Sequence, residues 1–237
     1  MATNGKMSPQ KIARVTGVLF LITYVTSIPA ALVLYVPVLD NPNYIVGGGG
    51  ADDGVALGAF LELILIIANI GTAIVLYPVV KRVNEILALG YVTARVVECA
   101  FIAVGLISLL SVVTLRKEAA GADAGSLVAV GQSLVALHDW TFVLGPGFVV
   151  GVGNGLILGY LMYKSALVPR GMAMLGLIGG PLIIASGSQS CSGSSRQALC
   201  GRSSRPSRVL LGAVAWHLAH RQRIQSICGC FPVYRSR

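Results

Sequence analysis

Residues 55–80 read VALGAFLELILIIANIGTAIVLYPVV, and Glu62 is the only charged residue among them. A helix needs about 20 predominantly apolar residues to cross the hydrocarbon core of a bilayer, which is roughly 30 Å thick. Because lipid offers no hydrogen bonds, every backbone N–H and C=O must be satisfied within the spanning segment, and a helix does this. The stretch therefore predicts a transmembrane helix.

Comparable apolar runs lie on both sides of this stretch. One precedes it at residues 15–39, and three follow at 86–115, 140–163 and 171–186. The first run is longer than the apolar core of a signal peptide, about 7–15 residues, so we expect an uncleaved span. No hydrophilic stretch of domain size separates the runs. The sequence predicts an all-α fold, a polytopic transmembrane helical bundle with five apolar spans in one domain, residues 1–186.

The overall composition agrees with a lipid-embedded fold. Hydrophobic residues make up 55% of the 237 residues and charged residues 11%, whereas a soluble domain carries about 25% charged residues. The lipid bilayer is therefore the expected partner. The formal charge of +9 does not indicate nucleic acid, because residues 1–186 hold ten Lys and Arg against nine Asp and Glu, and eight Arg lie in residues 187–237.

The region 126–163 is too long for one simple span. Apolar residues recur along one helical face from Leu127 to Leu137, and the sequence Gly145-Pro146-Gly147 should then break or kink the helix. We therefore expect residues 126–139 to form an interfacial or packed helix. The crossing itself should begin at Trp140, because indole rings favour the membrane interface.

The connecting loops predict the orientation, because cytoplasmic loops carry an excess of Lys and Arg. The residues that mark the inner side are Lys6, Lys11, Arg14, Lys81, Arg82, Lys164 and Arg170. We therefore expect a cell-membrane protein with a cytoplasmic N-terminus and with loops 40–54 and 116–125 outside. Arg116 and Lys117 fit this orientation less well.

Five polar residues in the second and third spans are the candidate binding residues. Tyr91, Arg95 and Glu98 share one helix face at spacings i, i+4 and i+7, and Glu62 and Asn69 share a face of the preceding span. At about 1.5 Å per residue, Glu62 and Glu98 should lie at one depth, with Arg95 about one turn deeper. We expect Glu62, Arg95 and Glu98 to meet.

Three interpretations of this cluster stay open. A charge at mid-bilayer costs about 2.5–3.5 kcal/mol, so it normally faces a partner or a cavity. The cluster could be a structural ion pair that locks two helices, a binding site through which a small solute or ion is held or moved, or a proton relay or reaction centre. Sealed, fully paired charges favour a structural or regulatory membrane protein, and a water-filled pocket open to one face favours solute or ion binding.

His138 and Asp139 form a second candidate pair. A His beside an Asp can serve acid–base chemistry or bind a metal, but without another nearby His or Cys the pair is a poor metal site. A capping or interfacial role at the outer face is the simpler interpretation. Since no nucleophile–base–orienter set is recognisable, the sequence predicts no catalytic residue, no metal and no cofactor.

Gly151, Gly155 and Gly159 form two overlapping GxxxG steps. Small residues four apart let helix backbones approach closely, so packing within the chain is the first interpretation and a homo-oligomer face is the second. A nucleotide-binding loop is excluded, because Leu156 stands where the GxGxxG pattern needs glycine.

Four stretches carry a resemblance to a known family. They are GVLFLITYVTSIPAALVLY (17–35), LGAFLELILIIANIGTAIVLYPVVKR (57–82), LGYVTARVVE (89–98) and LVALHDWTFVLGPGFVVGVGNGLILGYLMY (134–163). Over about residues 8–186 the chain resembles a bacterial membrane-protein family described as domain of unknown function 4386. The resemblance implies six membrane helices and brings no activity, substrate or cofactor.

Residues 187–237 depart from that family pattern. They are rich in Ser, Arg and Cys and contain no acid and no Lys. Their closest cysteine pair, Cys228 and Cys230, is one residue short of the tightest usual zinc spacing. With suitable synonymous codons, frame changes near 187 and near 206 restore the rest of the fifth span and an apolar last helix. We therefore interpret this tail as a frame-shifted, disordered or poorly packed translation.

Overall fold

The computed structural model describes residues 8–48, 50–118, 123–165 and 170–197, and the regular structure in these ranges is helical. The chain divides into two units, residues 1–184 and 185–237. Of the second unit, only the helical residues 185–197 are described. A sixth helix, Cys228 and Cys230 would lie outside the described residues.

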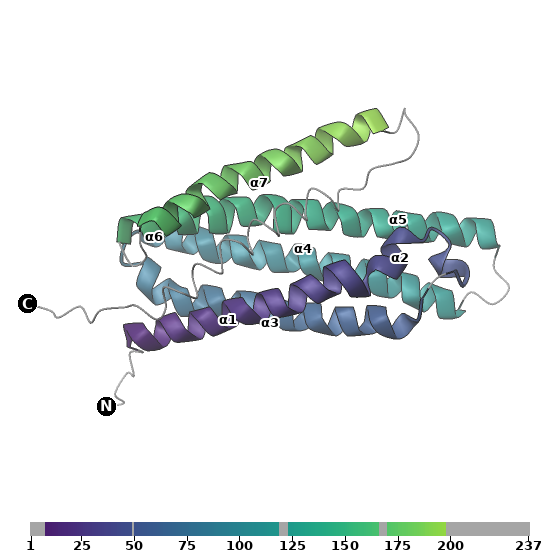
Figure 1. Ribbon diagram of the computed structural model, residues 1–237, viewed down its shortest axis with the longest axis horizontal. Helices are drawn as coiled ribbons and strands as arrows, with labels where there is room; N and C mark the ends of the chain where they lie inside the picture. Colours follow the sequence, from purple (N-terminus) through teal and green to yellow (C-terminus); the bar gives the residue numbers. More distant parts are fainter. Residues whose placement is uncertain (1–7, 49, 119–122, 166–169, 198–237) are drawn as a thin grey trace, which may run out of the picture. The chain divides into compact units, whose positions relative to one another are not determined.

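The described residues form α-helices that are interrupted by π-helical segments (Figure 1). In order, the elements are α1 (Pro9–Pro29), the π segment η1 (Ala30–Leu34), α2 (Val36–Asp40), the 3-10 turn η2 (Tyr44–Val46), α3 (Asp52–Val80), α4 (Glu85–Glu118), α5 (Ala124–Phe142), the π segments η3 (Val143–Val149) and η4 (Gly151–Leu158), α6 (Gly159–Ser165) and α7 (Arg170–Gln197).

Four helical paths within the described residues are long and apolar enough to cross a membrane. They cover Gln10–Asp40, Asp52–Val80, Glu85–Glu118 and Ala124–Ser165. The all-helical bundle that the sequence predicts is thereby confirmed. The fifth apolar run is a shorter helix, Ala173–Ala185, although α7 continues to Gln197.

The helix α4 is the centre of the packing. It contacts α3, α5, η3 and η4, while α1 packs mainly on α3. Figure 1 shows α1, α3, α4 and α5 running side by side, with successive helices in opposite directions. In the most apolar stretch of α4, 50% of the residues are buried, against 17% in that of the first path, Gln10–Asp40. A residue in the apolar part of α4 is therefore more often buried than one in the apolar part of α1.

Large aliphatic side chains lie exposed along the outer faces of these helices. Val25 is 69% exposed, Ile67 71% and Ile74 64%. Soluble proteins rarely leave apolar surface of this extent open to water. The outer faces are therefore suited to lipid.

At two prolines, Pro29 and Pro146, the helix continues as a π segment and does not break. The Tyr35 N–H donates to the carbonyl of Ala30, five residues back, just after Pro29. Likewise Val150 donates to Gly145 across Pro146. Proline removes a helical N–H and crowds the preceding turn, and the wider π turn accommodates this locally.

The expected break at Gly145-Pro146-Gly147 is therefore a change of helix type within a continuous path. The structure corrects the separate helix expected at residues 126–139, which belongs to α5 and packs along α4. Trp140 accordingly lies inside α5, and the start of the crossing at this residue stays a prediction.

An ion-pair network closes the bundle at the first turn of α3, which we call the Asp52 end. Arg116 Nη1 lies 3.1 Å from Asp52 Oδ1 and also donates to the Gly50 carbonyl. The Tyr44 hydroxyl donates to Asp52 at 2.9 Å. Lys117 Nζ lies 4.0 Å from Asp52 Oδ2. Arg116 and Lys117, which fit the charge pattern of the loops poorly, thus have a structural partner.

The glycine steps of η4 and α6 pack against α7 of the same chain. A Cβ on Gly151 would lie 2.7 Å from Ile184 Cγ1, and a Cβ on Gly159 would lie 3.3 Å from the Leu177 backbone nitrogen. Gly155 lies against Gly180 still more closely. The glycine face is therefore covered within the chain.

Candidate functional site

The register of α3 against α4 determines which polar residues meet. Asp52 contacts Arg116 at one end, and Asn69 contacts Glu98 further along. Asn69 lies 17 residues after Asp52, and Glu98 lies 18 residues before Arg116. Two antiparallel helices with the same rise keep this register, so Glu62, seven residues before Asn69, lies level with Gly105.

Asn69, Tyr91, Arg95 and Glu98 form one hydrogen-bonded group, which we call the Arg95 cluster. Arg95 Nη1 donates to Glu98 Oε2 at 2.7 Å and to Asn69 Oδ1 at 3.3 Å. Asn69 Nδ2 donates to Glu98 Oε1 at 3.1 Å. Arg95 Nε also lies 3.5 Å from the Tyr91 hydroxyl. Each carboxylate oxygen of Glu98 therefore receives a donor.

The Arg95 cluster is sealed inside the bundle. Arg95 is 4% exposed and Glu98 6%, and the guanidinium carbon lies 5.6 Å from the centre of the Phe20 ring. A guanidinium over an aromatic face gains cation–π attraction. The sequence did not predict Phe20 as a member of this group, because no spacing along the chain relates α1 to α4. The cluster joins α1, α3 and α4.

The structure brings together four of the five predicted span residues and places Glu62 elsewhere. Glu62 lies two helical turns, about 10 Å, nearer the Asp52 end than Asn69 does. Within the described residues it forms no ion pair with Lys or Arg. The depth estimate erred because it measured each span from its apolar limits, whereas α4 continues to Glu118.

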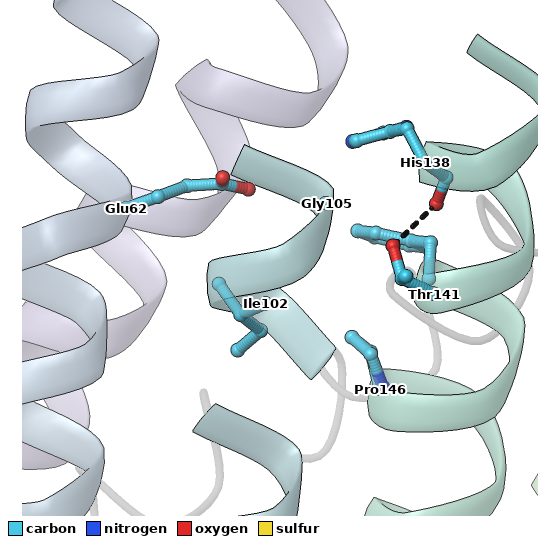
Figure 2. Close-up of a pocket in the computed structure, with 7 residues that line it drawn as sticks. Glu62, Ile102, Gly105, His138, Thr141 and Pro146 are labelled. Carbon is cyan, nitrogen blue, oxygen red and sulfur yellow. Dashed lines mark hydrogen bonds between the residues drawn. The ribbon is translucent and has the colours of Figure 1, made fainter. Parts of the chain in front are cut away.

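Glu62 faces a small pocket between α3, α4 and α5, which we call the Glu62 pocket. Figure 2 shows Glu62 and His138 pointing toward one another beside Gly105. The lining residues are Glu62, Ile102, Gly105, His138, Thr141, Phe142 and Pro146. The free space is about 10 Å³, on a scale where one water molecule needs roughly 10–15 Å³. The pocket is therefore of ionic or single-water size.

His138 is a buried residue within α5. It is 6% exposed, and its ring meets Tyr35 edge-on at 5.9 Å and Phe142 at 6.1 Å between centroids. This position differs from the expected capping or interfacial role at the start of a crossing. Within the described structure, His138 Nδ1 accepts or donates no hydrogen bond, although Asp139 Oδ1 lies 3.7 Å away.

Tyr35 is a buried neighbour of both Glu62 and His138. Its side chain is 1% exposed and lies beside Glu62. Its hydroxyl makes no hydrogen bond of ordinary length and angle with the described residues. A Cβ on Gly58 would lie 2.5 Å from the Tyr35 ring, so glycine at this position makes room for the ring. Three polar side chains, those of Glu62, His138 and Tyr35, thus lie together at this place.

Gly105 allows α5 to approach α4 at the pocket. A Cβ there would lie 2.6 Å from Thr141 Oγ1 and 3.3 Å from His138 Cδ2. The Thr141 hydroxyl itself donates to the His138 carbonyl at 2.7 Å, as Figure 2 shows. Tyr35, Gly58, Gly105 and Thr141 were missed from the sequence. Glycine and threonine are common in membrane helices for packing alone, so they carried no distinct signal.

Neither polar group has the composition of a metal centre. In the ranges that the structure describes, no three side chains among His, Cys, Asp and Glu gather closely enough to hold a metal ion. The Arg95 cluster contains a cation that already neutralises its carboxylate. The Glu62 pocket combines a carboxylate, an imidazole and hydroxyls, which can bind or exchange a proton.

The four long apolar paths and their enclosed polar residues define a multi-pass helical membrane protein. Residues 15–197 match the family described as domain of unknown function (DUF4386), and the chain belongs to that family. The match begins later and ends later than the resemblance seen in the sequence. No curated protein and no solved structure matches the chain.

Proposed function

We propose that this membrane protein binds an ion-sized ligand within the bilayer, in the Glu62 pocket. The observation that carries the proposal is the position of Glu62. This residue is 6% exposed, forms no ion pair with Lys or Arg among the described residues, and faces a buried histidine across free space. An intramembrane ionisable group placed in this way is a functional candidate, because charged residues inside membranes are costly and commonly mark binding sites or ion and proton pathways.

The size of the pocket restricts the ligand. Free space of about 10 Å³ accepts an object no larger than about one water molecule. An organic solute would need the helices to separate, and the packing of Gly105 against Thr141 opposes this. The proposal therefore narrows the ligand class to a small ion.

A structural role suits the Arg95 cluster. Its carboxylate, guanidinium and amide are mutually hydrogen-bonded and almost fully buried. A site that exchanges a ligand needs a group that is free to bind it. In this cluster the Glu98 carboxylate is already paired with the Arg95 guanidinium. We propose that the Arg95 cluster holds α1, α3 and α4 together.

We also propose that the Asp52 end faces away from the cytoplasm. Lys81 and Arg82 follow α3 at the opposite end, and Lys164 ends α6 there. At the Asp52 end, Arg116 and Lys117 are paired with Asp52. Pairing lowers their effective charge, which supports a cytoplasmic N-terminus under the positive-inside rule.

Trp140, two residues after His138, provides a direct test of ion binding. The chain has two tryptophans, so Trp216→Phe leaves Trp140 as the reporter. The full-length protein in lipid nanodiscs is titrated with H⁺, Na⁺, K⁺, Mg²⁺ and Cl⁻ at constant ionic strength. We expect at least one ion to change Trp140 emission and melting temperature, and Glu62→Gln to abolish the response.

Glu85→Gln is the matched control, because it makes the same acid-to-amide change at an exposed position of α4. It should respond like the unsubstituted protein. The proposed function is wrong if no ion acts, or if Glu62→Gln responds as the control does.

A further inference from the structure

We propose that the ion bound in the Glu62 pocket is a proton, which Glu62 and His138 hold in common and exchange through Asp139. This inference rests on the proposed function and names its ligand. It is carried by the geometry of the pocket: a buried carboxylate and a buried imidazole point toward one another (Figure 2), and the imidazole Nδ1 lies 3.7 Å from a second carboxylate, that of Asp139.

Charge conservation explains why one shared proton suits this pair. The shared proton can sit on either partner. On His138 it gives a carboxylate and an imidazolium, and on Glu62 it gives a carboxylic acid and a neutral imidazole. Both arrangements have no net charge. Losing that proton leaves a net negative charge and gaining another leaves a net positive one. A net charge within an apolar bundle costs several kcal/mol. An arrangement in which the two side chains share one proton therefore avoids a net charge in the pocket.

The groups that face the pair come from each neighbouring element of the pocket. The helix α3 contributes Glu62, α5 contributes His138 and Asp139, and the residue between η1 and α2 contributes Tyr35. The lining residues from α4, Ile102 and Gly105, and from η3, Pro146, carry no titratable group. Arg95 and Glu98 lie two turns deeper and compensate one another.

We assign the exchange to Asp139 because it is the most exposed member of this series. Its side chain is 48% exposed, whereas that of His138 is 8% exposed. The 3.7 Å between Asp139 Oδ1 and His138 Nδ1 is slightly too long for a hydrogen bond. A small side-chain rotation or one bridging water would connect them. His138 thus has both an exposed carboxylate and a buried one as neighbours.

The donor set favours a proton over a metal cation. A calcium ion takes 6–8 oxygen ligands and magnesium about six, and the pocket lining offers the two Glu62 oxygens and the Thr141 hydroxyl, which already donates to a carbonyl. Within the described residues there is no cluster of metal-ligating side chains at this position. A proton needs only the two groups that are present.

Carbodiimide labelling tests the inference on the full-length chain in phosphatidylethanolamine and phosphatidylglycerol vesicles. Dicyclohexylcarbodiimide enters bilayers and reacts with protonated carboxyl groups, and peptide mass spectrometry locates the product. We expect Glu62 to be labelled at low pH and progressively less as pH rises. Glu98 is the internal control, because its two hydrogen-bonded oxygens and its Arg95 partner should keep it unlabelled throughout.

The role of His138 is first tested by NMR of its own imidazole, with the pocket residues unchanged. With His217 and His220 replaced by Gln, His138 is the remaining histidine of the three, and its imidazole is followed by NMR after isotopic labelling. We expect Glu62 labelling and the imidazole signal to report the same midpoints. In His138→Gln, the Glu62 midpoint should move by roughly one pH unit or more.

The outcomes separate the two proposals. Labelling that is independent of pH, or midpoints of Glu62 and His138 that are unrelated, would overturn proton sharing. If Na⁺, K⁺ or Mg²⁺ protects Glu62 from labelling at constant pH, the ligand is that cation, and ion binding stands without the proton. An Asp139→Asn variant with an unchanged proton exchange rate, measured by NMR, would remove Asp139 from the route.

Discussion

At the scale of single residues, the decisive feature is how each buried charge is compensated. Arg95 and Glu98 neutralise one another at 2.7 Å, and Asn69 bridges them. Glu62, two turns away on the same helix face as Asn69, has a histidine and a tyrosine as neighbours. Glu98 is therefore held in an ion pair, whereas Glu62, also a glutamate, forms no ion pair with Lys or Arg among the described residues. This contrast, rather than the presence of charges, distinguishes a structural group from a binding group.

Arg95→Ala should cause a large loss of stability. It leaves the Glu98 carboxylate buried with only the Asn69 amide as a donor among the described residues, and removing one partner of a buried ion pair costs about 3–5 kcal/mol. Glu98→Gln should be milder, because it keeps hydrogen bonding without a charge. Equilibrium unfolding in mixed micelles measures both variants.

The double variant Arg95→Met with Glu98→Met serves as the comparison. Replacing a whole buried ion pair with apolar residues is often close to neutral, so it should be more stable than Arg95→Ala alone. If Arg95→Ala loses less than about 1 kcal/mol, comparable to an exposed pair, the cluster does not fasten the helices.

At the scale of elements, helix ends and π segments position the pocket residues. The η3 segment follows His138 and Thr141 directly and contributes Pro146 to the lining. π turns inside helices occur frequently at functional sites. At the other end of α5, Asp123 caps the helix, its Oδ2 accepting from the Ser126 N–H at 2.8 Å. The direction of α5, and with it the placement of His138, therefore depends on features at both its ends.

The Asp123 cap predicts an acid-sensitive helix end. The Ser126 backbone N–H holds the pKa of the Asp123 carboxyl below its ordinary value. Because the folded pKa is lowered, the stabilisation is present above the unfolded pKa, about 4, and is lost as pH falls through the folded pKa. Protection of the Ser126 and Leu127 amides in hydrogen exchange, corrected for intrinsic rates, should decrease in that acid range.

Asp123→Asn provides the comparison for this helix end. Asparagine is an equally good cap but does not titrate, so protection in this variant should not depend on pH in the acid range. Asp123→Ala should show faster exchange at every pH. An equal acid-induced loss in Asp123→Asn would mean that another group is responsible.

At the scale of the whole molecule, membership of the DUF4386 family and four long apolar helical paths establish a multi-pass membrane protein. The orientation of these paths remains a prediction from the loop charges. The interpretation of residues 187–237 as a frame-shifted tail also remains a prediction, although the family match reaches residue 197. Sequencing of the gene together with mass spectrometry of the C-terminal peptide would check the tail.

Single-cysteine labelling tests the orientation. In a background with the native cysteines replaced, Asn43→Cys reports the Asp52 end and Glu85→Cys reports the opposite end, and both positions are exposed. In intact cells, an impermeant maleimide should label Asn43→Cys alone. Permeabilised cells should show both sites labelled, and labelling of Glu85→Cys in intact cells would reverse the proposed topology.

The sequence alone determined the fold class and placed Tyr91, Arg95 and Glu98 on one face of a single helix. Run length against bilayer thickness decides whether a helix can cross, and the spacing of Tyr91, Arg95 and Glu98 along one helix puts them on one face. Both are local properties of the chain. The sequence therefore already contained the group that proves to be paired and sealed.

Only the tertiary structure decided the partner of Glu62. That choice depends on the register of α3 against α4, which follows from contacts such as Asp52 with Arg116, and on the close approach of α5 at Gly105. A register change of seven residues leaves every helix pattern in the sequence intact, yet it moves a side chain about 10 Å along its neighbour. Glu62 consequently meets His138, on a helix that the spacing within α3 could not identify.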